Sequence, residues 1–337
     1  MRNAMAWGPK AIFLSVLLFP CLAATTLAQS DLDEVHVAPL TNAGNSASVK
    51  LQPPLLSHAA EIIRKQVDLV LVPVTITDER DRLLTGLQED NFQVFDGKHR
   101  QQIKHFSSED APVSLGIVLD LSSSMASKME WARQAVLEFC KAANPADEFF
   151  MVSFADRPEL LAGFTDHIED IQERLTSAVP HGRTALLDAV YFAIHQMRGA
   201  KYPKRALLII SDGGDNHSRY GEREVRSLLK EADVMLYAIA LIDPTSQVLE
   251  EVRGPELLEE ITSLTGGRAF GIGQPNLLPA IANKVGMELR NQYVLGYHPD
   301  NAIHNGKWHR IQVKIKLPKS IWPVWIHAKS GYYAPTE

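Results

Sequence analysis

The sequence predicts an α/β protein with a doubly wound, mostly parallel sheet, flanked by a small β domain built from both ends of the chain. Between residues 112 and 291, short continuous apolar runs alternate with amphipathic stretches of helical period, which is typical of a parallel sheet covered on both faces. Before and after this region the residues alternate singly and are rich in β-branched types, as half-buried strands are. We therefore expect an α/β domain inserted in a discontinuous β domain.

The first segment, residues 1–28, has the layout of a secretory signal peptide. Arg2 and Lys10 precede an apolar stretch over residues 11–22, and small residues lead to a cleavage site after Ala28. About twelve apolar residues are too few to span a bilayer comfortably, which argues against an uncleaved anchor. Cys21 raises the alternative of a lipoprotein, but "LFPC" places Phe and Pro where a lipobox has small residues. We expect export to the periplasm, the outer cell surface or the medium.

Composition limits the partners and the means of stabilisation. The whole chain has 337 residues, a formal charge of −6 and two cysteines, one of which lies in the leader. The leader carries two positive charges and no negative ones, so the mature chain is more acidic still, which argues against nucleic acid as a partner. Cys140 remains alone, and no internal disulfide can form. No later stretch is apolar and long enough for a transmembrane helix.

Residues 29–66 are rich in Asn, Ser and Pro without sustained periodicity, and they are interpreted as a linker. The next segment, residues 67–111, predicts strands. Asp96 and Gly97 form a pair suited to a tight turn between two of them. The two strand-like stretches are "VDLVLVPVTITDE" and "FQVFDGKHRQQIKHF".

Residues 112–291 predict four buried strands and six helices. The strands are "SLGIVL", "EFFMVSF", "RALLIIS" and "VMLYAIALI". The helices are "KMEWARQAVLEFCKAA", "HIEDIQERLTSA", "ALLDAVYFAIHQM", "GEREVRSLLKEA", "PELLEEITSLTG" and "LLPAIANKVGMELRNQ". Cys140 lies on the apolar face of the first helix and is expected to be a buried core thiol.

Residues 292–337 again have the pattern of strands, in "YVLGYHP", "HRIQVKIKL" and "VWIHAKSGYYA". In the second of these, apolar residues alternate with Arg310, Gln312, Lys314 and Lys316. This basic face is either a binding stripe or the solvated face of a sheet. Alternation of this kind is what half-buried strands show, so a solvated face is expected.

Polar residues follow two of the predicted strands directly. "DLSSSM" contains Asp120, Ser122 and Ser124, and "SDGGDN" contains Asp212. In an open α/β sheet, the loops at the carboxyl ends of the strands converge on the ligand site. A third segment, "HGRTALLDAV", opens a helix with Thr184, whose hydroxyl is again a hard oxygen donor. We expect these five residues to lie at one edge of the sheet.

Such a set of oxygen donors suits Mg²⁺, with Mn²⁺ or Ca²⁺ as alternatives. Because several donors are neutral hydroxyls, the ion would stay electron-poor and take an outside carboxylate. Asp and Ser are also ordinary helix N-caps, but capping needs one such residue and explains neither Thr184 nor Asp212. Three neighbours are interpreted as supporting residues: Asp188 as a helix residue bonded to backbone, Asp215 as a loop residue and His181 as an exposed loop residue.

These residues resemble the metal-ion-dependent adhesion site of von Willebrand factor type A (VWA) domains. That pattern is Asp-x-Ser-x-Ser after the first strand, a Thr in a middle loop and an Asp in a later loop. All five positions are met in order, over a region of about residues 112–290. The resemblance implies that Ser122, Ser124 and Thr184 bind the ion directly or nearly so, and that Asp120 and Asp212 bind it directly or through water.

The flanks resemble those of a bacterial family of exported VWA-related proteins seen especially in Acidobacteria. The likeness rests on "VTITDERDRLLTGLQEDNFQVFDGK" before the domain and on "YVLGYHPDNAIHNGKWHRIQVKIK" with the final "SGYYAP" after it. It supports the architecture more than a role.

The combined expectation is an exported, non-catalytic adhesion or scaffold protein, in which the ion takes an acidic side chain of a protein partner. The sequence leaves its oligomeric state open. One alternative is an accessory VWA subunit of an envelope assembly or of an ATPase-linked complex, against which the leader argues. A metal-dependent hydrolase is the other. It is disfavoured because Ser122 stands where an aspartyl-phosphate phosphatase has a second Asp, and no G-x-S-x-G or phosphate-binding G-x-x-x-x-G-K-[ST] occurs.

Overall fold

The computed structural model describes residues 69–242, 249–299, 306–318 and 323–334, all within one compact unit, residues 64–337. The predicted leader, 1–28, and the linker, 29–66, lie outside the described residues, so both stay predictions. Within the described ranges, no helix combines the length and the apolar character needed to cross a membrane.

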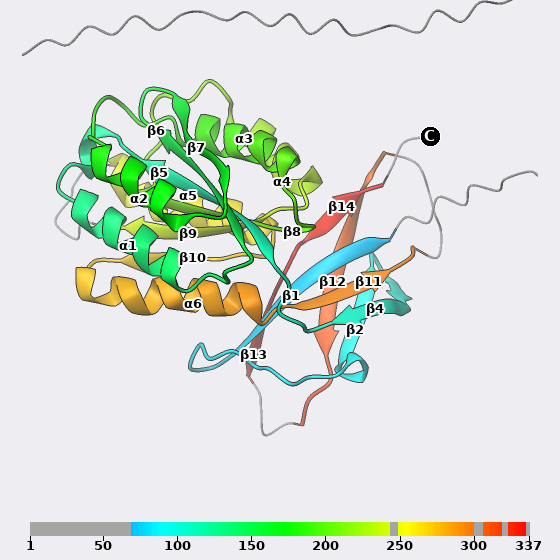
Figure 1. Cartoon of the computed structure of the whole chain (residues 1–337). Coiled ribbons are helices and arrows are strands. Elements are labelled where there is room, and N and C mark those ends of the chain that lie inside the picture. Colours follow the sequence, from blue (N-terminus) through cyan, green and yellow to red (C-terminus); the bar gives the residue numbers. More distant parts are fainter. Residues whose placement is uncertain (1–68, 243–248, 300–305, 319–322, 335–337) are drawn as a thin grey trace, which may run out of the picture. The chain divides into compact units, whose positions relative to one another are not determined.

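A six-stranded sheet, in the order β10-β9-β8-β5-β6-β7, forms the centre of the α/β part (Figure 1). All neighbouring strands pair in parallel except β6 and β7, which are antiparallel. The strands are β5 (Val113–Asp120), β6 (Glu148–Phe154), β7 (Pro158–Thr165), β8 (Lys204–Ser211), β9 (Met235–Leu241) and β10 (Ala269–Ile272). The predicted mostly parallel sheet is confirmed.

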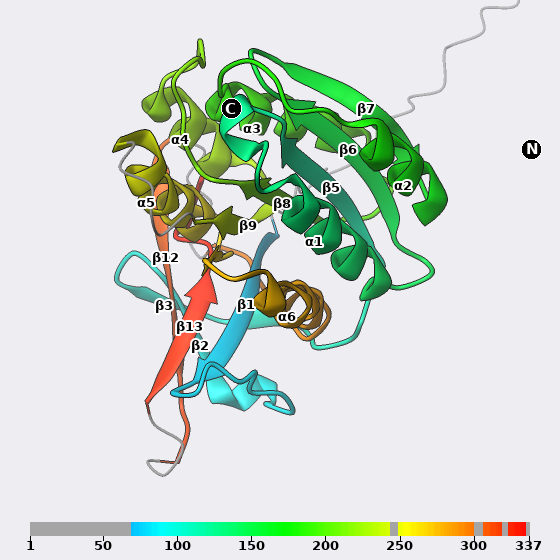
Figure 2. The same ribbon diagram turned by 90° about the vertical axis from the view of Figure 1, so that its left-hand side faces the viewer.

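Three helices cover each face of this sheet. The helices are α1 (Met129–Lys141), α2 (Ile168–Ser177), α3 (Leu186–Gln196), α4 (Glu222–Glu231), α5 (Leu249–Leu264) and α6 (Leu278–Arg290). Alternate residues of β5 point to opposite faces: Ile117 packs into the core under α1, α2 and α6, and Val118 into the core under α3, α4 and α5. Figure 2 shows α1 and α6 side by side on the first of these faces. Cys140 of α1 is buried and free, as predicted.

Three details of the α/β part differ from the prediction. The strands β7 and β10 were not foreseen: β7 opens with Pro158 and is only half buried, and β10 has four residues. Helix α5 begins at Leu249, ahead of the proline expected to open it, so that Pro255 lies inside. A proline restricts the residue before it, and here that residue is Gly254, the type that tolerates the restriction best.

The two flanks of the α/β part pair with each other in two four-stranded antiparallel sheets, β13-β1-β11-β4 and β14-β12-β2-β3. Strand β1 pairs with β11 and β13, and β2 pairs with β12. The strands are β1 (Val70–Asp78), β2 (Phe92–Asp96), β3 (His99–Gln101), β4 (Ile103–Ser107), β11 (Tyr293–Tyr297), β12 (Trp308–Ile315), β13 (Val324–Ala328) and β14 (Gly331–Tyr333). The expected β region built from both flanks is confirmed, while its boundaries at residues 111 and 292 stay predictions.

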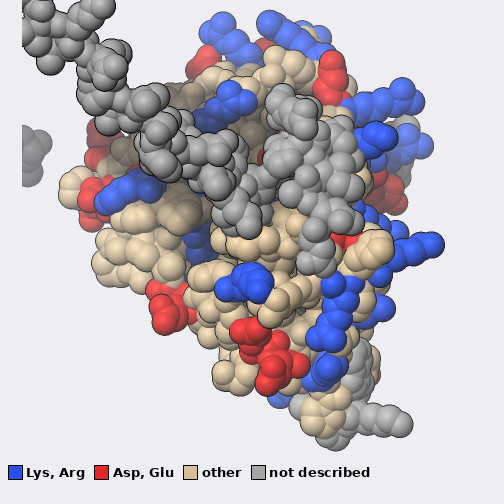
Figure 3. Space-filling model, turned by 90° about the vertical axis from the view of Figure 1, so that its right-hand side faces the viewer, with Lys and Arg blue, Asp and Glu red and all other residues tan. Residues whose placement is uncertain are grey.

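Strand β12 has the predicted alternation. Ile311, Val313 and Ile315 are buried, whereas Arg310 and Lys314 are exposed. Figure 3 shows the side of the molecule that lies to the right in Figure 1, and Lys and Arg side chains gather along one border of this face. The basic residues of β12 therefore lie on the outer face of a sheet whose inner face is packed.

Charged groups also link the β region to the α/β part. Arg268 Nη1 lies 2.9 Å from Asp81 Oδ1 and 2.6 Å from Glu288 Oε1, and Lys284 pairs with Asp81 as well. Burial is the largest cause that lowers the pKa of the nearby His327, to about 4, and the charge of Arg268 lowers it further. We call Asp81, Arg268, Lys284, Glu288 and His327 the junction cluster.

Candidate metal site

Asp120 is the last residue of β5, and its carboxylate is buried. Its Oδ1 accepts a hydrogen bond from the backbone N–H of Ser122 at 2.8 Å, and its Oδ2 accepts one from the Ser211 hydroxyl at 2.5 Å. Ser211 ends the neighbouring strand β8, so this bond joins the two strand ends that carry the predicted ligands. Sequence reasoning missed Ser211, although it is the first residue of "SDGGDN".

The loop that follows Asp120, here called the serine loop, contains Ser122 and Ser124 and includes a short 3-10 helix, Ser123–Met125. The hydroxyl oxygens of Ser122 and Ser124 lie 3.0 Å apart, whereas Ser123 between them is exposed. The backbone N–H of Ser123 donates to the Gly182 carbonyl at 3.1 Å. The loop that leads to Thr184 is thereby tied to the serine loop.

Thr184 is buried in the loop before α3. Its backbone N–H donates to Asn216 Oδ1 at 3.0 Å, and its carbonyl accepts the N–H groups of Asn216 and His217, each at 3.0 Å. These bonds tie the Thr184 loop to the loop that begins at Asp212. The three predicted loops are therefore cross-linked to one another.

Asp212 follows β8 and is 3% exposed. Its Oδ2 accepts a hydrogen bond from Lys128 Nζ at 3.1 Å. Its Oδ1 is buried and has no hydrogen-bond partner within the part of the chain that the structure describes. A buried carboxylate oxygen without a partner is costly, so this atom is suited to accept a ligand. Sequence reasoning also missed Lys128, which lies four residues beyond Ser124.

The backbone of α5 holds the Asp212 loop in place. A Cβ atom at Gly213, where φ is +82°, would lie 2.4 Å from the Gly254 carbonyl carbon. A Cβ atom at Gly254 would lie 2.3 Å from the Asp212 carbonyl oxygen. Only glycine at both positions allows this approach. The conformation of the Asp212 loop therefore depends on its contact with α5.

Electrostatics at the site favour a cation. Burial raises the pKa of Asp120 to about 7, with the charge of Asp212 as the second cause, although hydrogen bonds from Ser122 and Ser211 act in the opposite direction. Two buried carboxylates that influence each other resist carrying two charges at once. A cation between them would relieve this conflict.

The residues present fit a hard divalent cation. The hydroxyls of Ser122 and Ser124, the unpartnered oxygen of Asp212 and the carboxylate of Asp120 are oxygen donors of the kind that Mg²⁺ prefers. The described residues contain no group of three or more His, Cys, Asp or Glu side chains arranged to hold a metal. An ion here would thus depend on the hydroxyl groups as much as on the two carboxylates.

Three neighbouring residues behave as supporting groups. Asp188 Oδ1 accepts the backbone N–H groups of Arg219 at 2.8 Å and Tyr220 at 3.0 Å, which confirms its predicted backbone-bonding role. Asp215 Oδ1 accepts the N–H of Ser218 at 3.3 Å, within its own loop. His181 is exposed, as predicted.

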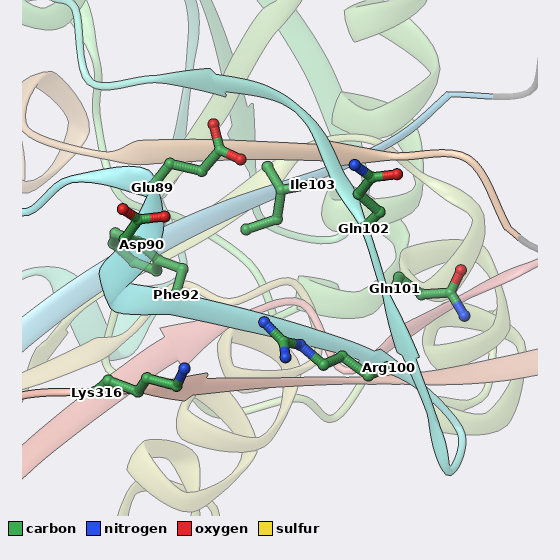
Figure 4. A pocket seen from close by; sticks show the side chains of 8 residues that line it. All are labelled: Glu89, Asp90, Phe92, Arg100, Gln101, Gln102, Ile103 and Lys316. Atoms are coloured by element: carbon green, nitrogen blue, oxygen red, sulfur yellow. The ribbon is translucent and has the colours of Figure 1, made fainter.

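A hollow of about 450 Å³ lies elsewhere, in the β region. Figure 4 shows the side chains around it, with carboxylates and cations both present. Its lining residues are Glu89, Asp90, Phe92, Arg100, Gln101, Gln102, Ile103 and Lys316. None of these belongs to the predicted set, and its four charged residues are exposed. The hollow is therefore separate from the candidate metal site.

Comparison with protein families supports the domain type. Residues 115–214 match the family model of the von Willebrand factor type A domain. The chain contains a VWA domain. All five predicted ligands, from Asp120 to Asp212, fall within the matched residues. A search of curated proteins gave no match.

Several solved structures are similar to part of this chain. BatB from Bacteroides thetaiotaomicron is 17% identical, with 52% of this chain and 98% of that chain covered and a TM-score of 0.43. The vWF domain of the type V pili tip protein Mfa5 from Porphyromonas gingivalis is 12% identical, with 53% and 95% covered and a TM-score of 0.44. At these values, neither similarity carries a conclusion about what this VWA domain binds.

Proposed function

We propose that this chain is an exported, non-catalytic adhesion or scaffold protein whose VWA domain binds a protein partner through a divalent cation. The observation that carries the proposal is the buried, unpartnered Oδ1 of Asp212, beside the buried Asp120 and two adjacent serine hydroxyls. Mg²⁺ suits these donors best, with Mn²⁺ or Ca²⁺ as alternatives.

Each residue of the set has a distinct part in the proposal. The hydroxyls of Ser122, Ser124 and Thr184 would bind the cation as neutral donors, and Asp120 and Asp212 would bind it directly or through water. The bound cation would supply a Lewis-acidic position that accepts an oxygen from outside. Hydroxyl donors leave the cation poorly neutralised, which favours an anionic oxygen. We therefore propose that the partner provides an Asp or Glu side chain.

The site supports binding better than catalysis. The Ser211 hydroxyl donates a hydrogen bond to Asp120 Oδ2, and Lys128 Nζ donates one to Asp212 Oδ2. Both side chains therefore hold the carboxylates of proposed ligands in place. The serine loop, the Thr184 loop and the Asp212 loop are cross-linked through backbone atoms. A rigid set of donors around a cation suits a reversible contact with one carboxylate.

The metal and the partner can be tested together by pull-down from a cell-envelope extract. The bait proteins are the wild type, Asp120→Ala and the matched control Ser123→Ala, which removes an exposed hydroxyl from the same loop. Each is used with Mg²⁺ or with chelator, after circular dichroism has shown that it is folded. We expect a protein retained by the wild type and by Ser123→Ala only when Mg²⁺ is present. Retention of the same proteins under all conditions would refute the proposal.

A further inference from the structure

We propose that Lys128 is a built-in competitor of the divalent cation, whose ammonium charge at Asp212 sets the affinity of the site for metal. This inference rests on the proposed metal site. It assigns a role to a residue outside the five predicted ligands.

The contact between Lys128 and Asp212 is buried on both sides. Lys128 Nζ lies 3.1 Å from Asp212 Oδ2, and the two side chains are 6% and 2% exposed. Lysine is almost never buried to this degree unless its charge is paired. The ammonium group thus belongs to the candidate site and not to the solvent around it.

The backbone of Lys128 is fixed beside the serine loop. Its N–H donates to the Met125 carbonyl at 2.8 Å, and its carbonyl accepts the N–H of Ala132 at 3.0 Å in the first turn of α1. From this position the side chain reaches a carboxylate 84 residues further along the chain. Lys128 therefore connects the loop after β5 with the loop after β8.

Charge balance gives this contact its consequence. Lys128 places its ammonium group 3.1 Å from a carboxylate oxygen of Asp212, one of the proposed ligands of the cation. A divalent cation that enters the site meets a fixed positive charge on one of its own proposed ligands. The repulsion inside a poorly solvated site is strong, so Lys128 must weaken metal binding.

Lys128 has a second effect that acts in the opposite direction. By holding Oδ2 of Asp212, it restricts the carboxylate and leaves Oδ1 as the oxygen without a partner. A neutral hydrogen-bond donor could provide the same restraint. We expect the charge effect to be the larger of the two. The repulsion between a divalent cation and a nearby ammonium group exceeds the net energy of one hydrogen bond that orients the carboxylate.

Three substitutions separate charge from hydrogen bonding. Lys128→Gln keeps a donor and removes the charge, Lys128→Met removes both, and Lys128→Arg keeps both. Mn²⁺ affinity is measured by calorimetry and by the electron paramagnetic resonance of free Mn²⁺. We expect the Gln and Met variants to bind Mn²⁺ about tenfold more tightly than the wild type, and the Arg variant to resemble the wild type. Lys329→Met, which removes a charge paired with the exposed Asp233, is the control and should bind like the wild type.

A second readout follows the thermal unfolding of the same proteins. Without metal, Lys128→Met should unfold at a lower temperature than the wild type, because Asp212 keeps a buried charge without its ammonium partner. Saturating Mn²⁺ should raise the unfolding temperature of this variant more than that of the wild type.

The outcomes distinguish this inference from the proposed function. Wild-type binding of Mn²⁺ with equal or weaker binding by the Gln and Met variants would overturn the role of Lys128 and leave the metal site standing. Binding by the neutral variants alone would support the role of Lys128 and refute metal-dependent function in the natural chain. No binding by any of the proteins would refute both.

Discussion

Two groups of charged residues, each with a buried carboxylate, differ in the ratio of positive to negative groups. The junction cluster pairs two carboxylates, Asp81 and Glu288, with two cations, Arg268 and Lys284. The candidate metal site has two carboxylates, and one ammonium group, that of Lys128, contacts Asp212. Both groups contain buried atoms without a hydrogen-bond partner in the described chain, including Asp212 Oδ1 in one and Glu288 Oε2 in the other.

The difference shows which feature identifies a cation site. An unpartnered buried oxygen occurs in both groups, so it does not distinguish them. The junction cluster has two cations for its two carboxylates, whereas the described residues bring one ammonium group, that of Lys128, into contact with Asp212. This contrast supports the proposed cation site at Asp120 and Asp212 and a structural role for the junction cluster. The predictions below test this contrast, beginning with the largest expected effect.

Arg268→Met should cause the largest loss of stability. It leaves Glu288, whose side chain is fully buried, without the guanidinium that lies 2.6 Å away. Removing one partner of a buried ion pair costs about 3–5 kcal/mol, which should appear in the free energy of unfolding in denaturant. Asp233→Asn, which breaks a contact with a largely exposed carboxylate, is the control and should cost less than about 1 kcal/mol. Equal small losses in both variants would remove the structural role of the junction cluster.

His327 should make the stability of the junction cluster depend on pH. Burial is the largest cause that lowers its pKa in the folded chain to about 4, from an ordinary value of 6.5. Between these values the unfolded chain binds more protons, so this contribution is fully present above pH 6.5 and is lost as the pH falls towards 4. The loss amounts to at most about 3 kcal/mol. Denaturant unfolding at pH 7 and pH 4.5 should show a smaller difference in the free energy of unfolding for His327→Gln than for the wild type. An unchanged difference would argue against a half-buried, neutral imidazole at this position.

Asp81→Asn should have the smallest effect of the three. Its carboxylate contacts both Arg268 and Lys284, but the side chain is 45% exposed, so solvent weakens both pairs. We expect a loss of about 1 kcal/mol or less in the free energy of unfolding. A loss as large as that of Arg268→Met would mean that the ion pairs of Asp81, and not that of Glu288, stabilise the junction cluster.

Much of the fold follows from the sequence because buried parallel strands have a strong pattern. The continuous apolar runs of β5, β6, β8 and β9 leave little choice of structure. The edge strands β7 and β10 carry no such pattern, since β7 is half exposed and β10 has only four residues. Pairing between the flanks could be inferred only because both have the residue pattern of half-buried strands. Their register could not be predicted, because it depends on contacts between residues more than 200 positions apart.

Residues of the candidate site that directly follow a predicted strand could be proposed from the sequence. Residues whose long side chains contact a different loop could not. Asp120, Ser122 and Ser124 follow a strand at fixed intervals, and Asp212 follows the neighbouring strand. Ser211 and Lys128 act through side chains that cross from one loop to another. Nothing in their local sequence indicates which carboxylate each would meet. The charge balance of the site could therefore be read only from the folded chain.

The most direct test of the account is the position of Mn²⁺ in crystals of residues 29–337, located by its anomalous scattering. We predict one peak within coordination distance of Asp212 Oδ1 and of the hydroxyls of Ser122 and Ser124, and no such peak in crystals of Asp212→Asn. A peak at Glu288 in the junction cluster, or a peak at the candidate site that persists in Asp212→Asn, would contradict it.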